Sequence, residues 1–390
     1  MESCHEELVA TIPSGSSLYY SLKANPHPSL VAALASRGCG AEVSSPRELD
    51  VALQSVPLDR CIYTGPGKTD ADIAYAIAKG VTRFSVESAT ELKRLRALSD
   101  SAGRQTKYLL RVNSPGGART GLRMTGRPSQ FGVDLSQLEA DHSLFVSSDA
   151  CQFVGLHFFP ASNVADEAHL ADIFEHSIAT AAQLCANHDV QLRELNLGGG
   201  FAAPFGAAGG YSTLTVVRDR LAEALDAAFP QRAGSRPMMA FESGRRLVAA
   251  SGTLLTRVID VKLSGGRRFA IAESGANHLG GFGALQRVMR SQIMPRVIAQ
   301  VMSSSPDGSG GITLVGPTGA PPDIVVDDMI GLDVASGDLL AFDNVGAYGL
   351  TASLVAFLSR DFPAEIVHDG DTIVSATRMA LPRIEISELE

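Results

Sequence analysis

The sequence predicts an α/β fold, a (β/α)8 barrel of the TIM type followed by a C-terminal all-β domain. Short apolar runs alternate with amphipathic helical patterns up to Arg245, and the long helical patterns then stop. Such alternation gives parallel strands with helices outside them, and eight units favour a closed barrel over an open doubly wound sheet. A barrel gathers the C-terminal ends of its strands at one mouth, where its chemistry lies. There the sequence puts a lysine after the first strand and three glycines after the seventh.

The barrel strands are expected where apolar, β-rich runs recur, and helices are expected after most of them. The second helix, for example, opens with Ser45 as N-cap, Pro46 at the first helical position and Glu48 in the first turn. The expected strands are residues 18–22, 40–43, 62–64, 83–86, 108–112, 153–158, 194–197 and 238–241. The other expected helices are residues 28–36, 69–78, 88–98, 165–186 and 213–228.

The C-terminal part has a different pattern, in which turn signals such as Asp-Gly-Asp at 369–371 separate strand-like runs. We therefore predict residues 15–247 as the barrel and 248–390 as the β domain, with residues 1–14 as an N-terminal segment that can join the β domain. The strands expected after the barrel are residues 254–262, 268–272, 311–315, 338–342 and 372–375.

The composition is that of a well-filled globular protein. The 390 residues are 45% hydrophobic and 19% charged, with a formal net charge of −9. This acidic balance disfavours nucleic acid and anionic membranes as partners, and no apolar run reaches the roughly 18 residues that a spanning helix needs. The first residues have neither the basic region nor the apolar core of a secretion signal. Five cysteines without CxxC or metal-ligand spacing indicate reduced thiols, a cytoplasmic location and no metal site.

Three features at the expected barrel mouth suggest pyridoxal phosphate chemistry. Lys23 can form a Schiff base there, although such a lysine alone would more often be a simple surface residue. The glycines at 198–200 let backbone N–H groups converge on a phosphate, or they form only a tight turn. Glu242, at the end of the eighth strand, can pair with a protonated pyridine nitrogen, as a decarboxylase needs. Its alternative is a salt bridge to Arg245 or Arg246.

Other strand ends carry further candidates. Phe159 can lie flat on a cofactor ring, and His157 points the same way by strand alternation, unless it is an ordinary hydrogen-bonded core histidine. Arg111 can hold a phosphate or a carboxylate, or form a structural ion pair inside the barrel. Ser162 can donate to a phosphate or be a simple loop serine. In the β domain, Tyr348 lies between glycines, so its hydroxyl can approach a ligand closely, or it is structural.

At these residues the sequence resembles the fold-type III, pyridoxal-phosphate-dependent amino-acid decarboxylases, the family of the ornithine and diaminopimelate decarboxylases. The matching motifs are LKANP (22–26), GAEVS (40–44), GGGF (198–201), ESGR (242–245) and GAYG (346–349). The resemblance implies an alanine racemase-like barrel with Lys23, His157 and Glu242 as catalytic residues. The implied cofactor-binding residues are Lys23, Glu42, Arg111, Phe159, Ser162, Gly198, Gly199, Gly200, Glu242, Gly244, Arg245 and Tyr348. The implied substrate contacts are His278, Arg290, Thr318, Gly319 and Asp323, and the alternative for His278, Arg290 and Asp323 is a structural role.

The resemblance is nearest to members from secondary metabolism, through YTGPGK (63–68), QFGVD (130–134) and ESGR (242–245). Among these are siderophore-pathway enzymes and the butirosin-pathway enzyme, which acts on glutamate tethered to an acyl carrier protein. The implied reaction is decarboxylation of an L-amino acid or a derived substrate, through a Lys23 Schiff base and a quinonoid intermediate. The implied partners are the substrate, an acyl carrier protein if the substrate is tethered, and a second copy of the chain in a homodimer with shared sites. The alternatives are a racemase or epimerase on the same fold and a regulatory homologue with weak catalysis.

The chain departs from the family at three places. Phe159 stands where many members have a histidine. Gly319 stands where the family has a cysteine that returns a proton to the α-carbon, and Ala320 follows where a polar residue often faces the substrate amine. The stretch before Lys23 is shorter than in relatives. Loss of a general acid commonly lowers a rate by about 10²- to 10⁴-fold. Without the cysteine, the proton could come from Lys23, His157, water or another donor.

Overall fold

The computed structural model describes residues 1–114, 122–126, 128–230, 236–280, 293–300, 310–321, 323–383 and 385. The chain divides into two compact units. The first unit is formed by residues 1–204 and 209–251, and the second by residues 205–208 and 252–390. Each unit is considered by itself below. Within the described residues, no helix combines the length and the apolar character needed to cross a bilayer.

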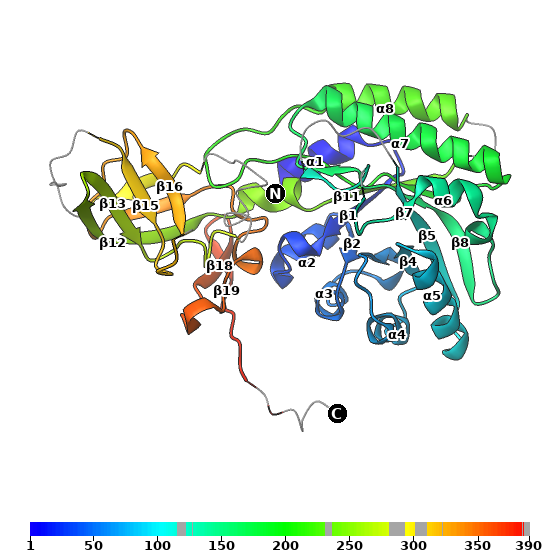
Figure 1. Cartoon of the computed structure of the whole chain (residues 1–390), viewed down its shortest axis with the longest axis horizontal. Coiled ribbons are helices and arrows are strands. Elements are labelled where there is room, and N and C mark those ends of the chain that lie inside the picture. Colours follow the sequence, from blue (N-terminus) through cyan, green and yellow to red (C-terminus); the bar gives the residue numbers. More distant parts are fainter. Residues whose placement is uncertain are drawn as a thin grey trace. The chain divides into compact units, whose positions relative to one another are not determined.

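The first unit is a closed barrel of eight parallel strands, which confirms the predicted fold class. The strands follow the order β1-β2-β3-β4-β5-β8-β10-β11, and β11 pairs with β1 to close the ring. Figure 1 shows these strands between α7 and α8 on one side and α3, α4 and α5 on the other. The strands are β1 (Ser17–Ser21), β2 (Gly40–Val43), β3 (Cys61–Tyr63), β4 (Arg83–Val86), β5 (Thr106–Asn113), β8 (Cys151–His157), β10 (Glu194–Asn196) and β11 (Met238–Ser243).

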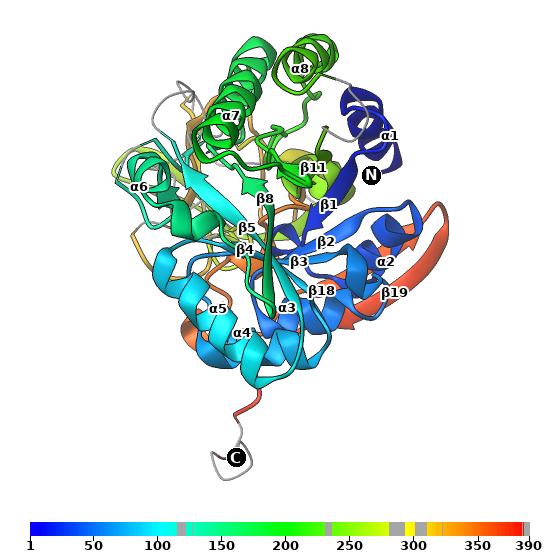
Figure 2. The same cartoon turned by 90° about the vertical axis from the view of Figure 1, so that its right-hand side faces the viewer.

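Helices surround the barrel, as Figure 2 shows in a view turned by 90°. Ser45, Thr69 and Ser88 each cap a helix, because their side chains accept a hydrogen bond from a backbone N–H in the first turn. These caps explain why three predicted helices begin where they do. The helices are α1 (Glu2–Thr11), α2 (Pro28–Ser36), α3 (Pro46–Ala52), α4 (Asp70–Ala78), α5 (Ala89–Ser101), α6 (Leu135–Ala140), α7 (Glu167–His188), α8 (Thr215–Ala228) and α9 (Arg245–Val248).

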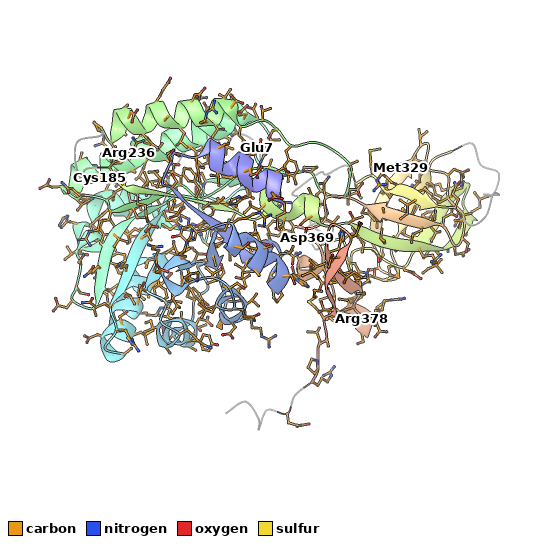
Figure 3. All side chains as sticks on the ribbon, turned by 180° about the vertical axis from the view of Figure 1, so that it is seen from behind. Glu7, Cys185, Arg236, Met329, Asp369 and Arg378 are labelled. Carbon is orange, nitrogen blue, oxygen red and sulfur yellow. The ribbon has the colours of Figure 1, made fainter. Side chains whose placement is uncertain are left out.

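The N-terminal segment differs from the expectation. The sequence suggests that residues 1–14 join the β domain, whereas the structure has α1 there, as part of the first unit. Arg246 on α9 is fully buried and donates to Glu7 Oε2 of α1 at 2.8 Å and to the Ser212 carbonyl at 2.7 Å. Figure 3 labels Glu7 on α1. A buried guanidinium needs such partners, so α1 is fixed to the barrel by a specific ion pair.

Short strands add to the barrel. β7 (Val133–Asp134) pairs with the end of β5, and β6 (Leu122–Arg123) pairs with β9 (Ala161–Ser162), which follows β8. Both pairings therefore extend from the C-terminal ends of barrel strands.

The barrel interior is apolar at mid-height. Tyr19, Ile62, Leu109, Val154 and Ala240 form a buried cluster there, contributed by five different strands. Because residues two apart on a strand share a face, the same strands direct polar residues toward the barrel mouth. The register pairs Tyr19 with Glu242 and Ser21 with Glu42.

The second unit is built on a six-stranded sheet with the order β14-β17-β12-β13-β15-β16, and a separate hairpin, β18–β19. Its core includes Val258, Leu314, Leu340 and Phe342. Figure 3 labels Met329 on β16, and Asp369 and Arg378 on the hairpin. The strands are β12 (Leu254–Ser264), β13 (Arg267–Ala272), β14 (Arg296–Ala299), β15 (Ile312–Val315), β16 (Ile324–Met329), β17 (Leu339–Phe342), β18 (Ala364–Asp369) and β19 (Thr372–Arg378).

Candidate active site

Lys23 lies at the C-terminal mouth of the barrel, in a 3-10 turn (Leu22–Ala24) that follows β1. Its Nζ lies 3.1 Å from each carboxylate oxygen of Glu42, and 5.6 Å from the centroid of the Phe159 ring. The Lys23 side chain is 43% exposed, whereas that of Glu42 is 1% exposed. The amine therefore projects from a buried carboxylate toward open space, where a ligand can reach it.

Glu42 is held in place by hydroxyl groups. Thr64 Oγ1, at the end of β3, donates a short hydrogen bond to Glu42 Oε1, and Ser44 Oγ lies 3.5 Å from the same oxygen. Thr64 is itself buried. These contacts orient the carboxylate beside Lys23.

Glu242 lies at the end of β11 and is 2% exposed. Asn196 Nδ2 donates to its Oε1 at 2.9 Å, and His157 Nε2 lies 3.2 Å from the same oxygen. Among the described residues none pairs with Oε2. Burial by itself would raise the pKa of Glu242, but the nearby His157, Lys23 and Arg111 outweigh it and lower the pKa. The carboxylate is thus ionised at neutral pH with one oxygen held and the other available.

The alternative of a salt bridge from Glu242 to Arg246 does not form, because the Arg246 guanidinium pairs with Glu7 instead. Arg245 is buried at the start of α9. The preceding Gly244 approaches the turn that carries Lys23 so closely that a Cβ there would lie 2.7 Å from Ala24 Cβ and 3.1 Å from the Ser21 carbonyl oxygen. Because Gly244 has no side chain, the start of α9 at Arg245 can pack directly against the turn that carries Lys23.

The glycine triplet forms a turn that no other residue type fits. Gly198 and Gly200 have φ of +67° and +104°, and a Cβ on Gly199 would lie 2.3 Å from the Glu242 carbonyl oxygen. Gly198 N donates to Asn196 Oδ1 at 2.9 Å. The buried amides of Gly199 and Gly200 donate to no described residue. Buried N–H groups normally have acceptors, so this turn suits an anionic ligand such as a phosphate.

Arg111 forms the ion pair that the sequence left as one alternative. Its Nη1 donates to Glu87 Oε1 at 2.8 Å, and both side chains are buried. The guanidinium lies 4.8 Å from the Phe131 ring centroid and 5.8 Å from that of Phe159, while its Nε has no partner among the described atoms. Arg111 is therefore held beside Phe159, and its Nε–H has no acceptor among the described atoms.

A buried lysine supports this pair. Lys68 Nζ lies 2.6 Å from Glu91 Oε1 and donates to the Ser85 carbonyl at 2.8 Å. Glu91 Oε2 in turn accepts the Glu87 backbone N–H at 3.2 Å. Burial lowers the pKa of Lys68, while Glu91 and Glu87 oppose that shift. Lys68 and Glu91 therefore help to hold Glu87 in position to pair with Arg111.

Ser162 lies on β9, half-buried, opposite Leu122 in the β6–β9 pairing. It therefore stands just beyond the end of β8, on the strand extension that also follows Phe159.

The remaining predicted residues belong to the second unit. Asp323 is buried and accepts from Ala276 N at 2.7 Å and from the hydroxyl of Thr318 at 2.6 Å, so these two close the loop around Gly319. His278 Nδ1 lies 2.9 Å from Ser274 Oγ. Tyr348 has a left-handed backbone with φ of +56°. Arg290 lies outside the described residues.

A cavity of about 460 Å³ lies at the opposite end of the barrel from Lys23, beside the beginnings of β5 and β8. None of the predicted site residues lines it. Its lining is Gln105, Ser147, Ser148, Asp149, Gln152, Phe153 and Arg193.

Sequence reasoning missed the polar residues that support the site from inside the barrel. Those on or next to a strand share one signal, which is a polar side chain at an inward position of an otherwise apolar run, whereas Lys68 lies in the loop before α4 and Glu91 lies on α5. Ser85 and Glu87 are two apart on and just after β4, as this signal requires. The supporting residues are Thr64, Lys68, Ser85, Glu87, Glu91 and Asn196.

The residues at the mouth fit pyridoxal phosphate. A lysine amine, a carboxylate with a free oxygen for a ring nitrogen, an aromatic ring and two unbonded amides for a phosphate all lie at the ends of β1, β8, β10 and β11. This donor set matches each polar part of the cofactor.

Comparison with known proteins agrees with this arrangement. The sequence profile of the family described as pyridoxal-dependent decarboxylase, pyridoxal binding domain, matches residues 2–249, more than half of the chain. A Staphylococcus aureus protein, 2-[(L-alanin-3-ylcarbamoyl)methyl]-2-hydroxybutanedioate decarboxylase, is 29% identical over 92% of this chain and 89% of its own length. The L-glutamyl-[BtrI acyl-carrier protein] decarboxylase of Niallia circulans is 29% identical over 94% of this chain and 86% of its own length.

Two further comparisons involve diaminopimelate decarboxylases. The Pseudomonas aeruginosa enzyme is 30% identical over 90% of this chain and 81% of its own length. The crystal structure of the Helicobacter pylori enzyme complexed with L-lysine has a TM-score of 0.83, with 24% identity, 97% of this chain covered and 92% of that chain. The structural likeness shows the shared fold. With the family profile, it establishes that the chain belongs to the fold-type III, pyridoxal-phosphate-dependent amino-acid decarboxylases.

Proposed function

We propose that this chain decarboxylates an amino-acid-derived substrate of specialised metabolism, with Lys23 as the residue that holds the cofactor. The observation that carries the proposal is the Glu242 carboxylate. It is buried and ionised, with Oε1 engaged by Asn196 and His157 and Oε2 available. An anionic partner for the ring nitrogen favours decarboxylation, whereas a racemase would sooner place a cation there.

Bound pyridoxal phosphate supplies an electron sink for the pair that the departing carboxyl group leaves behind. Lys23 supplies the amine for covalent attachment, and Glu42 lies where it can hold that amine or take a proton from it. Gly199 and Gly200 would offer their amides to the phosphate, with Arg245, Ser162 and Tyr348 as further ligands. Phe159 lies beside Lys23, where it would cover one face of the ring.

The proton that returns to the α-carbon needs a donor, because Gly319 has no side chain to supply it. Both ring nitrogens of His157 face groups inside the barrel, namely Ser85 and Glu242. Lys23 is exposed at the mouth, and its amine would be available there once the substrate amine has taken its place. We therefore assign the proton return to Lys23.

Two relatives support a specialised substrate. One is named for a carbamoyl-linked alanine derivative of a hydroxybutanedioate, and the other for a glutamyl group on an acyl carrier protein. Ala320 removes a polar contact to a side-chain amine, which disfavours ornithine, lysine and diaminopimelate. We propose a siderophore-type or carrier-tethered substrate, processed in the cytoplasm, where the free cysteines remain reduced.

We also propose a homodimer with shared active sites. In this arrangement the loop 316–323 and the segment around Tyr348 reach the barrel of the other copy. His278, Thr318, Gly319 and Asp323 would then shape the substrate side of that site.

The experiment that tests the function is borohydride reduction of the purified protein, followed by intact and peptide mass spectrometry. We expect a visible absorption band that reduction removes, and a pyridoxyl group on the Lys23 peptide. Lys79→Ala is a matched control for Lys23→Ala, because both lysines are 43% exposed and lie 3.1 Å from a carboxylate. Carbon dioxide release is then measured on free amino acids, carrier-bound aminoacyl groups and siderophore intermediates. Failure of the wild-type protein to bind the cofactor contradicts the proposal, and binding without any turnover identifies a regulatory homologue.

A further inference from the structure

His157 contacts a serine from a strand two places away in the barrel. Ser85 on β4 and His157 on β8 are both buried, and Ser85 Oγ lies 2.7 Å from His157 Nδ1. β4 and β8 each pair with β5 and not with one another. The contact therefore passes over the inner face of β5 and fixes the imidazole from its Nδ1 side.

The other ring nitrogen faces the carboxylate at the mouth. His157 Nε2 lies 3.2 Å from Glu242 Oε1 but is not aligned for a hydrogen bond, and it has no other partner among the described atoms. If the Ser85 hydroxyl donates to Nδ1, the imidazole hydrogen is on Nε2, beside the carboxylate. The ring then presents positive charge density to Glu242.

Asn196 completes the contacts of that oxygen. Its Nδ2 donates to Glu242 Oε1 at 2.9 Å, and its Oδ1 accepts from Gly198 N at 2.9 Å. One amide side chain therefore links the carboxylate to the first residue of the glycine turn. As a result, Oε1 is held from two sides while Oε2 is left without a partner among the described residues.

We propose that Ser85, His157 and Asn196 form a positioning set that aims Glu242 Oε2 at the ring nitrogen of bound pyridoxal phosphate. This inference rests on the proposed function, because it takes Glu242 as the partner of that nitrogen. His157 is thus a positioning residue, and it does not deliver the proton to the substrate. A side chain that orients a catalytic ligand from behind contributes to affinity without touching the substrate, as supporting groups do around bound metals.

The test compares variants that keep or remove the nitrogen facing Glu242. His157→Gln keeps an N–H donor at similar reach, His157→Leu removes it, and Ser85→Ala releases the imidazole. The readouts are the dissociation constant of pyridoxal phosphate and the ¹⁵N signal of its labelled ring nitrogen in the full-length protein. We expect His157→Leu to weaken binding by about 10- to 100-fold, the size of effect that follows removal of a group supporting a bound metal's ligand, and to shift the ¹⁵N signal toward the unprotonated form. His157→Gln retains most of both properties, and Ser85→Ala lies between.

Ser99→Ala is the matched control, because Ser99 is equally buried and bonds to the Leu95 carbonyl at 2.7 Å on a helix away from the site. It should change neither readout. Equal behaviour of the glutamine and leucine variants, or an unchanged leucine variant, overturns the proposal.

The imidazole itself gives an independent measurement. In the cofactor-free wild-type protein, ¹⁵N NMR should find the hydrogen of His157 on Nε2, and a hydrogen on Nδ1 overturns the assignment. This measurement also covers the case in which His157→Leu does not fold. If the wild-type chain binds no cofactor, the proposed function fails, while the NMR result still decides the Ser85–His157 arrangement.

Discussion

Glu242 shows how far one residue can be understood from the sequence. Its place at the end of the eighth strand and its motif identify it as a candidate, because the pattern of strands puts it at the mouth. Its ionisation depends on neighbours from other strands, since a buried carboxylate is costly unless it is paired. Asn196 and His157 come from β10 and β8, and no local pattern predicts their distances to Glu242.

Replacement of this carboxylate should separate catalysis from folding. Glu242→Gln keeps the size and the contact to Asn196 but removes the charge, so kcat for carbon dioxide release should fall by about 10²- to 10³-fold. Glu194→Gln is the control, because Glu194 is also a buried barrel glutamate and its partner is Arg83, at 3.2 Å. That variant should change the midpoint of thermal unfolding and leave kcat unchanged. Equal losses of kcat in the two variants would contradict the assignment.

Gly319 offers a gain-of-function test at the position where the family has its cysteine. Its φ is +64°, and a Cβ there would meet no heavy atom within 4 Å. Gly319→Cys should therefore cost only the left-handed backbone strain of about 1–2 kcal/mol in the free energy of unfolding. In D2O the thiol should increase the fraction of product with deuterium in one configuration. Gly319→Ala carries the same strain without the thiol. A similar increase in the fraction of product with deuterium in one configuration for that variant would contradict the prediction.

At the level of elements, capping and alternation made the barrel predictable. Predicted and observed limits agree closely for α2, α4 and β4, because Pro28, Thr69 and short β-rich runs mark them locally. In the second unit, β14, β16 and β18 were missed. β16 reads Ile-Val-Val-Asp-Asp-Met, with two acidic residues that weaken a strand pattern, and only its pairing with β15 makes it a strand. Context from other strands thus decides such cases.

Helix α3 gives a pH-dependent prediction. Burial raises the pKa of Glu48 to about 7, although its carboxylate accepts the Ser44 backbone N–H at 2.7 Å. The folded state therefore binds a proton at Glu48 more tightly than the unfolded chain, in which the pKa of this carboxyl is 4.5. The resulting stability is complete below that value and is lost as pH rises through about 7. In thermal unfolding at several pH values, the unfolding midpoint of Glu48→Gln should rise relative to that of the wild-type protein as pH rises from 4.5 to 7.

The exposed Glu139 on α6 provides the control for that series. Glu139→Gln should follow the wild-type protein at every pH. A difference between Glu48→Gln and wild type that is constant with pH would show that the Glu48 carboxyl does not titrate in this window.

The whole molecule raises the question of what covers its exposed apolar residues. Leu255 and Leu263 on β12 are 55% and 59% exposed, and Ile373 on the hairpin is 65% exposed. Clusters of such residues often mark protein interfaces. The sequence predicts the two kinds of domain from periodicity, but periodicity within one chain carries no information about a second copy. The homodimer therefore needs its own test.

Mixing two inactive variants tests whether the active site is shared between copies. Lys23→Ala removes the cofactor amine, and Tyr348→Ala removes the aromatic group expected from the other copy. In a random mixture of a two-fold dimer, half of the dimers are mixed and each of these has one intact site, so about one quarter of wild-type activity should return. Light scattering should give twice the chain mass of 40.9 kDa. A monomer contradicts the dimer, whereas a dimer whose mixed activity is only the mean of its parents places Tyr348 in its own copy's site, because then no mixed dimer would contain an intact one.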